Sequence, residues 1–124
     1  MDSPARDTPG DTGLRVLFTT APDSDTAARI ARALVDSHLA ACVSVLSPAT
    51  SVYRWQGAVE TAQEWPLMIK ATAARMSELK QALTRLHPYQ VPELVALPVV
   101  DGLPEYIAWA LDMCADQGDT AHRN

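Results

Sequence analysis

The stretch LRVLFTTAPDSDTAARIARALVDSHLAACVSVL, residues 14–46, carries the strongest signals of secondary structure in the chain. Apolar residues fall on both faces of its first segment, residues 14–20, as is typical of a central strand covered on both sides. The acidic turn that follows offers a helix N-cap at Asp23 or Ser24. Apolar residues then recur at helical spacing, and a second strand begins at Cys42. The stretch is therefore a strand, a helix and a strand in succession.

Outward from this unit the chain continues with the same kinds of element. We expect a strand over 42–56 with a bulge or bend near Pro48, a long strand over 57–73, a helix over 74–87, an edge strand over 92–100 and a last helix over 103–114. The order β-α-β-β-α-β plus a C-terminal helix predicts an α+β fold, the ferredoxin-like split βαβ sandwich. Right-handed crossovers place the first and third strands in the centre of the sheet and the second and fourth at its edges.

The length of 124 residues suits one domain. Residues 1–13 and 115–124 are polar and rich in turn-forming residues, so we expect disordered tails around a domain spanning 14–114. The two cysteines, Cys42 and Cys114, are far apart and form neither a disulfide framework nor a thiolate metal cage. Neither a signal-peptide pattern nor a membrane-length apolar run is present, which predicts a cytoplasmic protein without a membrane partner.

Charge and motifs narrow the function further. A net charge of −5 does not favour a nucleic-acid partner. The sequence contains no phosphate-binding glycine motif and no nucleophile elbow. Long edge strands and an apolar hairpin carrying Val52, Tyr53 and Trp55 would be poorly suited to water, so we expect an oligomer built by edge pairing.

Several motifs in sequence order resemble one family. They are TTAPDSDTAARIARALVDSHLAACVSVL, SVYRWQG, LMIKA, LHPYQVPELVALPV and PEYIAWALD. Together they span about residues 14–113 and resemble the CutA1 family of divalent-cation tolerance proteins. The resemblance implies a ferredoxin-like subunit, a PII-like homotrimer with hairpins crossing between subunits, and a role in the response to metal ions, with copper binding as the usual attribution.

The resemblance also implies copper ligands at the positions of Thr19, Leu86 and His87. Only His87 is a metal ligand by residue type, and one imidazole without a thiolate or a second histidine makes a weak copper site. We therefore take His87 as the candidate ligand for copper or another divalent cation. Its place at the end of a helix, before Pro88, also favours an imidazolium, which cannot bind a metal.

A second hypothesis is a ligand cleft between subunits. Lys70 lies in an otherwise apolar strand, so it must be paired or line a cavity, and Glu93 is its candidate partner. The cleft would comprise Lys70, His87, Tyr89 and Glu93, with Tyr53 and Trp55 nearby.

Structural roles compete with this cleft. His87 could cap its helix, Glu93 could begin a strand, Lys70 could form a buried ion pair, and the aromatic rings could lie in a subunit interface. We expect a binding or regulatory module rather than an enzyme. The alternative is an enzyme or small-molecule sensor in which Glu93 or His87 acts as a base and Lys70 holds an anion.

Overall fold

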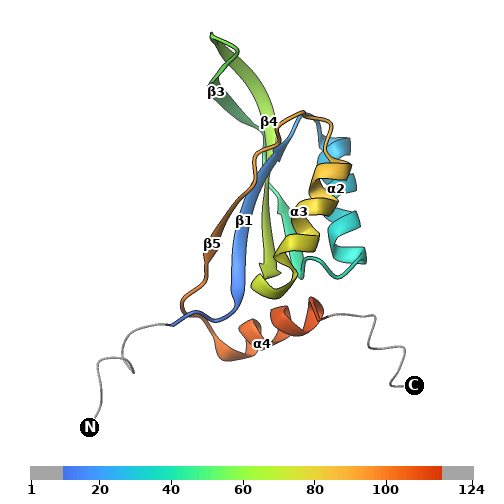
Figure 1. Cartoon of the computed structure of the whole chain (residues 1–124), viewed down its shortest axis with the longest axis vertical. Coiled ribbons are helices and arrows are strands. Elements are labelled where there is room, and N and C mark those ends of the chain that lie inside the picture. The colour runs from blue at the N-terminus through green and yellow to red at the C-terminus, as the bar shows by residue number, and fades with distance from the viewer. Residues whose placement is uncertain (1–9, 116–124) are drawn as a thin grey trace.

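The computed structural model describes residues 10–115. Its elements are β1 (Leu14–Ala21), α2 (Ser24–Asp36), β2 (Cys42–Val45), β3 (Ala49–Trp55), β4 (Ala58–Thr72), a 3-10 turn (Ala73–Arg75), α3 (Met76–Leu86), β5 (Val95–Pro98) and α4 (Pro104–Met113). The five strands form one antiparallel sheet in the order β2-β4-β1-β5, and β3 pairs with the outer part of β4 (Figure 1). The α+β ferredoxin-like prediction is confirmed: the first strand, β1, and the long β4 are central, while β2 and β5 lie at the edges.

The strand expected over 42–56 is interrupted, and the structure shows why. Val45 pairs with Leu67 and Ala49 pairs with Glu64, so three residues of one strand face two of β4. The extra residue is a bulge, and it falls in the segment 46–48, where Pro48 cannot donate to the ladder. The predicted bend is confirmed, and it separates the body of the sheet from a protruding β3–β4 hairpin.

The ends of the two large helices follow local chemistry. The Asp23 carboxylate accepts a hydrogen bond of 2.7 Å from the Thr26 backbone N–H, which caps α2 as predicted. The chain leaves α2 through His38, whose positive φ of 62° is the left-handed conformation common after a helix end. Helix α3 stops at His87, which is extended because Pro88 follows it.

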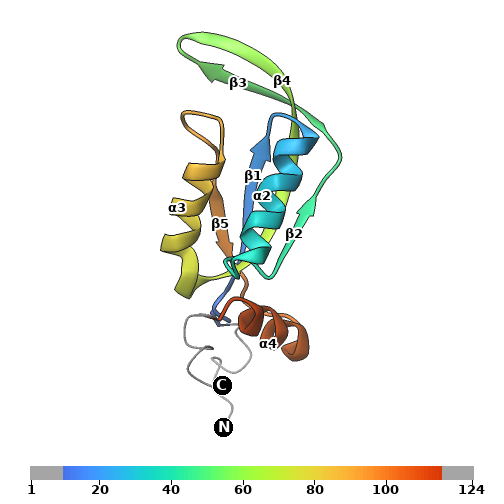
Figure 2. The same ribbon diagram turned by 90° about the vertical axis from the view of Figure 1, so that its right-hand side faces the viewer.

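The two faces of the sheet are covered differently. Helices α2 and α3 lie side by side over one face (Figure 2). The strand residues pointing toward them are buried: Leu17, Thr19 and Ala21 of β1, and Leu67, Ile69 and Ala71 of β4. We call this the covered face. It joins Ile30 and Leu34 of α2 and Leu79 and Leu83 of α3 in the main core.

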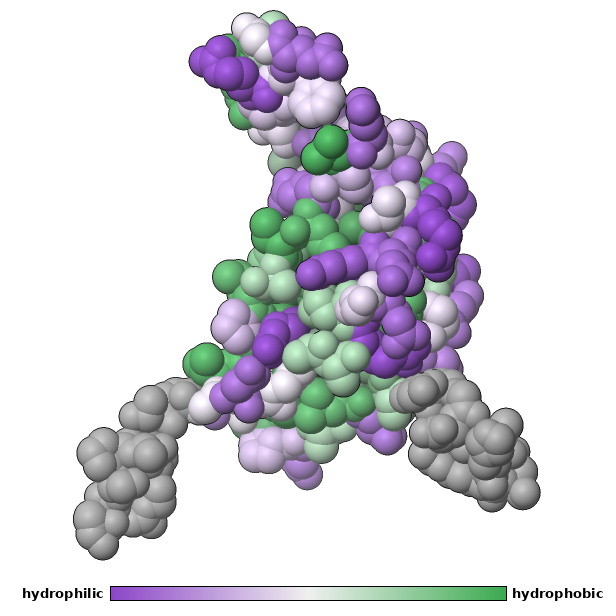
Figure 3. Space-filling model, in the orientation of Figure 1, coloured by the Kyte–Doolittle hydropathy of each residue, from purple (hydrophilic) through white to green (hydrophobic). Residues whose placement is uncertain are grey.

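The alternate residues point to the opposite side. Register pairs set Val16 beside Leu97 and Lys70, and Phe18 beside Val95 and Met68. We call these six residues the open face, because no helix of the described chain lies across them. Val95 and Leu97 are more than half exposed. Figure 3 shows apolar side chains gathered over the area of β1 and β5.

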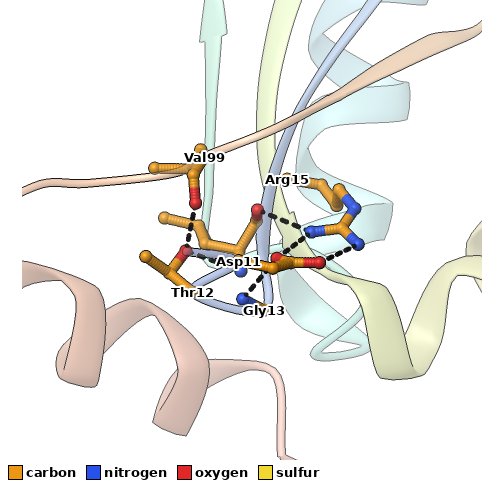
Figure 4. A network of polar contacts seen from close by, with 6 residues as sticks. Asp11, Thr12, Gly13, Arg15 and Val99 are labelled. Atoms are coloured by element: carbon orange, nitrogen blue, oxygen red, sulfur yellow. Dashed lines mark hydrogen bonds and ion pairs between the residues drawn. The ribbon is translucent and has the colours of Figure 1, made fainter. Parts of the chain in front are cut away.

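The N-terminal boundary lies earlier than predicted. Thr12 donates its hydroxyl to the Val99 carbonyl at 2.6 Å, and Asp11 forms a two-pronged ion pair with Arg15 at 2.8 and 3.0 Å (Figure 4). This pair and the Gly13 N–H hold the pKa of Asp11 down at about 2. Residues 11–13 were therefore wrongly placed in a disordered tail, because local polar contacts order them without burial of apolar surface. The rest of both predicted tails, apart from Gly10 and Ala115, lies outside the described residues.

Candidate functional site

A cavity lies where the hairpin bends over the α3–β5 loop, and its volume is about 580 Å³. Figure 2 shows the hairpin curving above this loop. The lining residues are Thr20 of β1, Ser51, Val52, Tyr53 and Trp55 of β3, Glu64 of β4, and Tyr89, Gln90, Val91 and Glu93 of the loop. Four of the six residues of the predicted cleft, Tyr53, Trp55, Tyr89 and Glu93, thus come together within one chain.

The hairpin sets the direction of two of these rings. Its turn consists of Gln56 and Gly57, whose φ values of 50° and 83° are both positive, as a two-residue type I′ turn requires. Such a turn fixes the register, with Trp55 opposite Ala58 and Tyr53 opposite Glu60. Because side chains alternate along a strand, Tyr53 and Trp55 point to the same side, and both line the cavity.

Glu64 lies at the base of the hairpin and was not among the predicted residues. It is 7% exposed, and its Oε2 accepts hydrogen bonds from the Tyr89 hydroxyl at 3.0 Å and the Thr20 hydroxyl at 3.1 Å. Its spacing in the sequence could have indicated it. Met68 and Lys70 lie an even number of positions after Glu64, so the three side chains share one side of β4. The prediction named Lys70 on this strand and omitted Glu64.

The hydrogen bond to Glu64 also changes the chemistry of Tyr89. Burial first, and then the neighbouring Glu64 carboxylate, raise the pKa of Tyr89 to about 12. The phenol therefore stays protonated at neutral pH and donates to the carboxylate. Tyr89 acts here as a fixed hydrogen-bond donor that orients Glu64.

His87 holds the loop to the sheet. The Tyr89 backbone N–H donates to His87 Nδ1 at 3.1 Å, so Nδ1 carries no proton and Nε2 is the protonated nitrogen that donates to the Thr20 carbonyl at 2.6 Å. The expected imidazolium does not fit this pattern, because a proton on Nδ1 would face another N–H. Both ring nitrogens are engaged and the side chain is buried, so a metal ion would have to displace one of these bonds.

Lys70 does not join the others. It pairs with Val16 and Cys42 in the middle of the sheet, six residues from Glu64 and about 20 Å from it along β4. Neither Lys70 nor Glu93 is in an ion pair among the residues from 10 to 115, so the predicted pair between them is absent. Strand register, which the sequence does not state, sets Lys70 on the open face, and its place in a cleft between subunits stays a prediction.

The implied copper positions do not form a metal site. Thr19 is 1% exposed on the covered face, and its hydroxyl has no hydrogen-bond partner in the described chain. Leu86 packs against the main core. Between residues 10 and 115 no group of three or more His, Cys, Asp or Glu side chains is arranged to hold a metal ion. Burial raises the pKa of the thiol of Cys114, the C-cap residue of α4, which packs with Leu14 and Ala41.

Fold and site together define a class: small ferredoxin-like α+β proteins with a projecting hairpin and a pocket at its base. The family model described as CutA1 divalent ion tolerance protein matches residues 15–113. The chain belongs to the CutA1 family. It is 47% identical over 94 residues to the divalent-cation tolerance protein CutA of Thermus thermophilus, a match covering 76% of this chain and 91% of that one.

Other relatives and solved structures agree. CutA of Pectobacterium atrosepticum is 40% identical over 94 residues, covering 76% of this chain and 86% of that protein. The crystal structure of CutA from Xylella fastidiosa matches with a TM-score of 0.80 at 44% identity, over 82% of this chain and 98% of that one. A structure from Archaeoglobus fulgidus, described as a periplasmic divalent cation tolerance protein, matches with a TM-score of 0.78 at 31% identity, over 82% and 98%.

Proposed function

We propose that this divalent ion tolerance protein works as a homotrimeric binding module. The observation that carries the proposal is the open face, where Val16, Phe18, Val95 and Leu97 form an apolar surface that no helix of the described chain covers. A contiguous apolar surface on a sheet marks an interaction site. A second copy of the chain has the same surface to bury, and closed symmetric assemblies are the usual outcome.

The edge strands and the hairpin support the same proposal. β5 pairs only with β1 among the described strands, so its other edge is free to accept a strand from a neighbour. The hairpin projects from the body and exposes Val52 and Val59 at more than 60% of their surface. A hairpin that reaches a neighbouring sheet would cover both features at once.

Light scattering on the full chain tests the assembly. The expected mass is three times that of one chain at micromolar concentration. A mass equal to one chain would contradict the trimer, and a mass of two chains would replace it with a dimer.

Growth of a deletion strain tests the role in cells. We expect the strain to be more sensitive than the parent to copper, zinc or cadmium salts, and a copy of the gene to restore growth. An unchanged response to all three salts would contradict a role of this protein in tolerance.

A second candidate is a small-molecule sensor that uses the cavity. The cavity volume of about 580 Å³ is typical of ligand sites, and its lining combines rings with a few polar groups. This candidate replaces the predicted Lys70, His87, Tyr89 and Glu93 cleft with one centred on Glu64 and Tyr89. It requires no catalytic step, and we favour binding over catalysis.

Copper binding at His87 is not the mode we propose, because both ring nitrogens are already bonded. A copper titration of His87→Ala tests this directly. We expect the variant to take up as much copper as the parent. Stoichiometric binding by the parent that the variant lacks would restore His87 as a ligand.

The cellular location and other partners stay predictions. We place the protein in the cytoplasm, and the periplasmic description of the Archaeoglobus relative gives the alternative. Fractionation of cells followed by immunoblotting distinguishes the two. No helix within residues 10–115 has the length and apolar character to cross a membrane.

A further inference from the structure

The cavity under the hairpin is lined by groups of one electrostatic kind. Glu64 and Glu93 contribute carboxylates, and Tyr53, Trp55 and Tyr89 contribute aromatic rings. No lysine, arginine or histidine is among its lining residues, and Asp23 lies close enough to help raise the pKa of Tyr89. Carboxylates and the faces of aromatic rings both attract cations.

Glu64 shows where a cation would bind. The side chain is more than nine-tenths buried, and no basic group lies within 4.0 Å of it in the part of the chain that the structure describes. Its Oε2 accepts the two hydroxyl hydrogen bonds, whereas Oε1 receives none from residues 10–115. Glu64 lines the cavity, and Oε1 is the carboxylate oxygen left for a ligand.

A buried carboxylate without a countercharge is costly unless a ligand supplies one. Neighbouring hydroxyls stabilise the carboxylate but leave the charge in place. A group that offers both positive charge and N–H donors would satisfy the free Oε1. The rings on the β3 side of the cavity would then cover the apolar part of such a ligand.

We propose that the cavity binds an organic ammonium ion, with its N–H groups on Glu64 and its carbon skeleton against Tyr53 and Trp55. The inference rests on the second function proposed above, a ligand site at the base of the hairpin, and names the chemical class of its ligand. A metal ion fits less well, because only two carboxylates line the cavity and hard divalent cations take six or more oxygen ligands.

Three probes of one shape and different charge test the proposal: phenethylammonium, 2-phenylethanol and phenylacetate. Isothermal titration into the full chain should give an affinity for the ammonium about tenfold higher than for the alcohol, since one cation–π contact with an ion pair is of that order. Phenylacetate should bind more weakly than the alcohol. Equal affinities for all three probes, no binding of any probe, or a preference for the anion would each overturn the proposal.

Two variants locate the charge. Glu64→Gln keeps an acceptor for Tyr89 but removes the charge, so the preference for the ammonium should disappear. Glu105→Gln removes the same charge from the exposed start of α4 and should leave the preference unchanged. A preference that survives in Glu64→Gln would contradict the role of Glu64.

A third variant keeps the test informative if Glu64→Gln fails to fold. Trp55→Leu changes an exposed hairpin position, and it should weaken ammonium binding more than alcohol binding. Equal weakening of both would count against the aromatic contact.

The test of ammonium binding can fail or succeed independently of the test of the trimer. A trimer with a growth phenotype but no ammonium preference would refute only this inference. A monomer that still prefers the ammonium would support this inference and contradict the trimer.

Discussion

The covered and open faces of the sheet are built by the same two central strands, yet they differ in what they pack against. On β4, Ile69 is fully buried against the helices, whereas the next residue, Lys70, points to the open face and is half-buried. On β1, Leu17 is buried, and Val16 lies beside the exposed Leu97. The chain covers one apolar face with its own helices, and no helix of the described chain covers the other.

The difference between the two faces bears on how an apolar strand in a small protein is interpreted. A run that is apolar on both faces indicates two covered faces, but it does not say whether the cover comes from the same chain. Here the helices of the same chain cover one face, and we propose that self-association covers the other. Substitutions on the two faces should therefore affect different properties, folding on one side and assembly on the other.

The largest expected effect on stability comes from placing a charge on the covered face, compared with removing one from the open face at the next residue. Ile69→Lys places a charge in the main core and should lower the free energy of unfolding by more than about 4 kcal/mol. Lys70→Met removes a charge from the open face and should change it by no more than about 1 kcal/mol. Urea unfolding followed by circular dichroism, at one fixed protein concentration, measures both.

Similar losses in the two variants would contradict the division into two faces. A Lys70→Met variant that unfolds at a higher urea concentration than the parent, by a margin that changes with protein concentration in a second series, would sharpen it. That result would locate Lys70 in the subunit interface.

The second prediction concerns assembly. Leu97→Glu places a carboxylate on the open face and should convert the proposed trimer to single chains while the α-helical signal is kept. Val35→Glu changes a similarly apolar and exposed residue of α2, and it should leave the mass unchanged. Light scattering gives the mass of each variant. Dissociation of Val35→Glu with retention of the Leu97→Glu trimer would move the interface to the helical side.

The third prediction concerns the stability that His87 contributes by anchoring the α3–β5 loop to Thr20 of β1. Thr20 accepts His87 Nε2–H at its carbonyl and donates its hydroxyl to Glu64. His87→Ala leaves a carbonyl and a backbone N–H without partners and should cost about 1–3 kcal/mol. Thr84→Ala, which removes an exposed hydroxyl bond on α3, is the control. Thermal unfolding that shows no larger loss for His87→Ala would contradict the anchoring role.

The smallest effect should appear in the titration of Tyr89. Its folded-state pKa of about 12 lies above the ordinary value of 10.0, so the stabilisation is complete below pH 10 and is lost as the pH rises through 12. The absorbance difference between the parent and Tyr89→Phe gives its midpoint. Glu64→Gln should lower this midpoint, although burial, the larger cause, keeps it above the ordinary value. An unshifted midpoint in the parent would contradict the buried hydrogen bond.

Much of the fold could be predicted because local signals agreed with one another. Asp23 caps its helix, Pro88 ends the next one, and Pro48 marks the bulge, each by a restriction of its own backbone or side chain. Right-handed crossovers between these elements then predict one order of strands in the sheet. The contacts of Asp11 and Thr12 were not predicted, because polar contacts hold these residues and leave no apolar pattern in the sequence.

The candidate site was predicted only in part, for a geometric reason. Tyr89 and Glu93 belong to one short loop, so their proximity follows from the sequence. Their meeting with Glu64 depends on how far β4 runs past the bulge, and pairing across the sheet decides that. Lys70 does not line the cavity within one chain, and a one-strand pattern does not reveal which end of a long strand faces a loop.

The unbroken length of β4 has a consequence for hydrogen exchange. Its inner residues, such as Ile69, are paired on both sides by β1 and β2, whereas its outer residues, such as Thr61, are paired only by β3. One strand should therefore carry both the slowest and the fastest exchanging strand amides in the described chain. The step between them should fall near Glu64, so that opening of the hairpin is felt first at the carboxylate that lines the cavity.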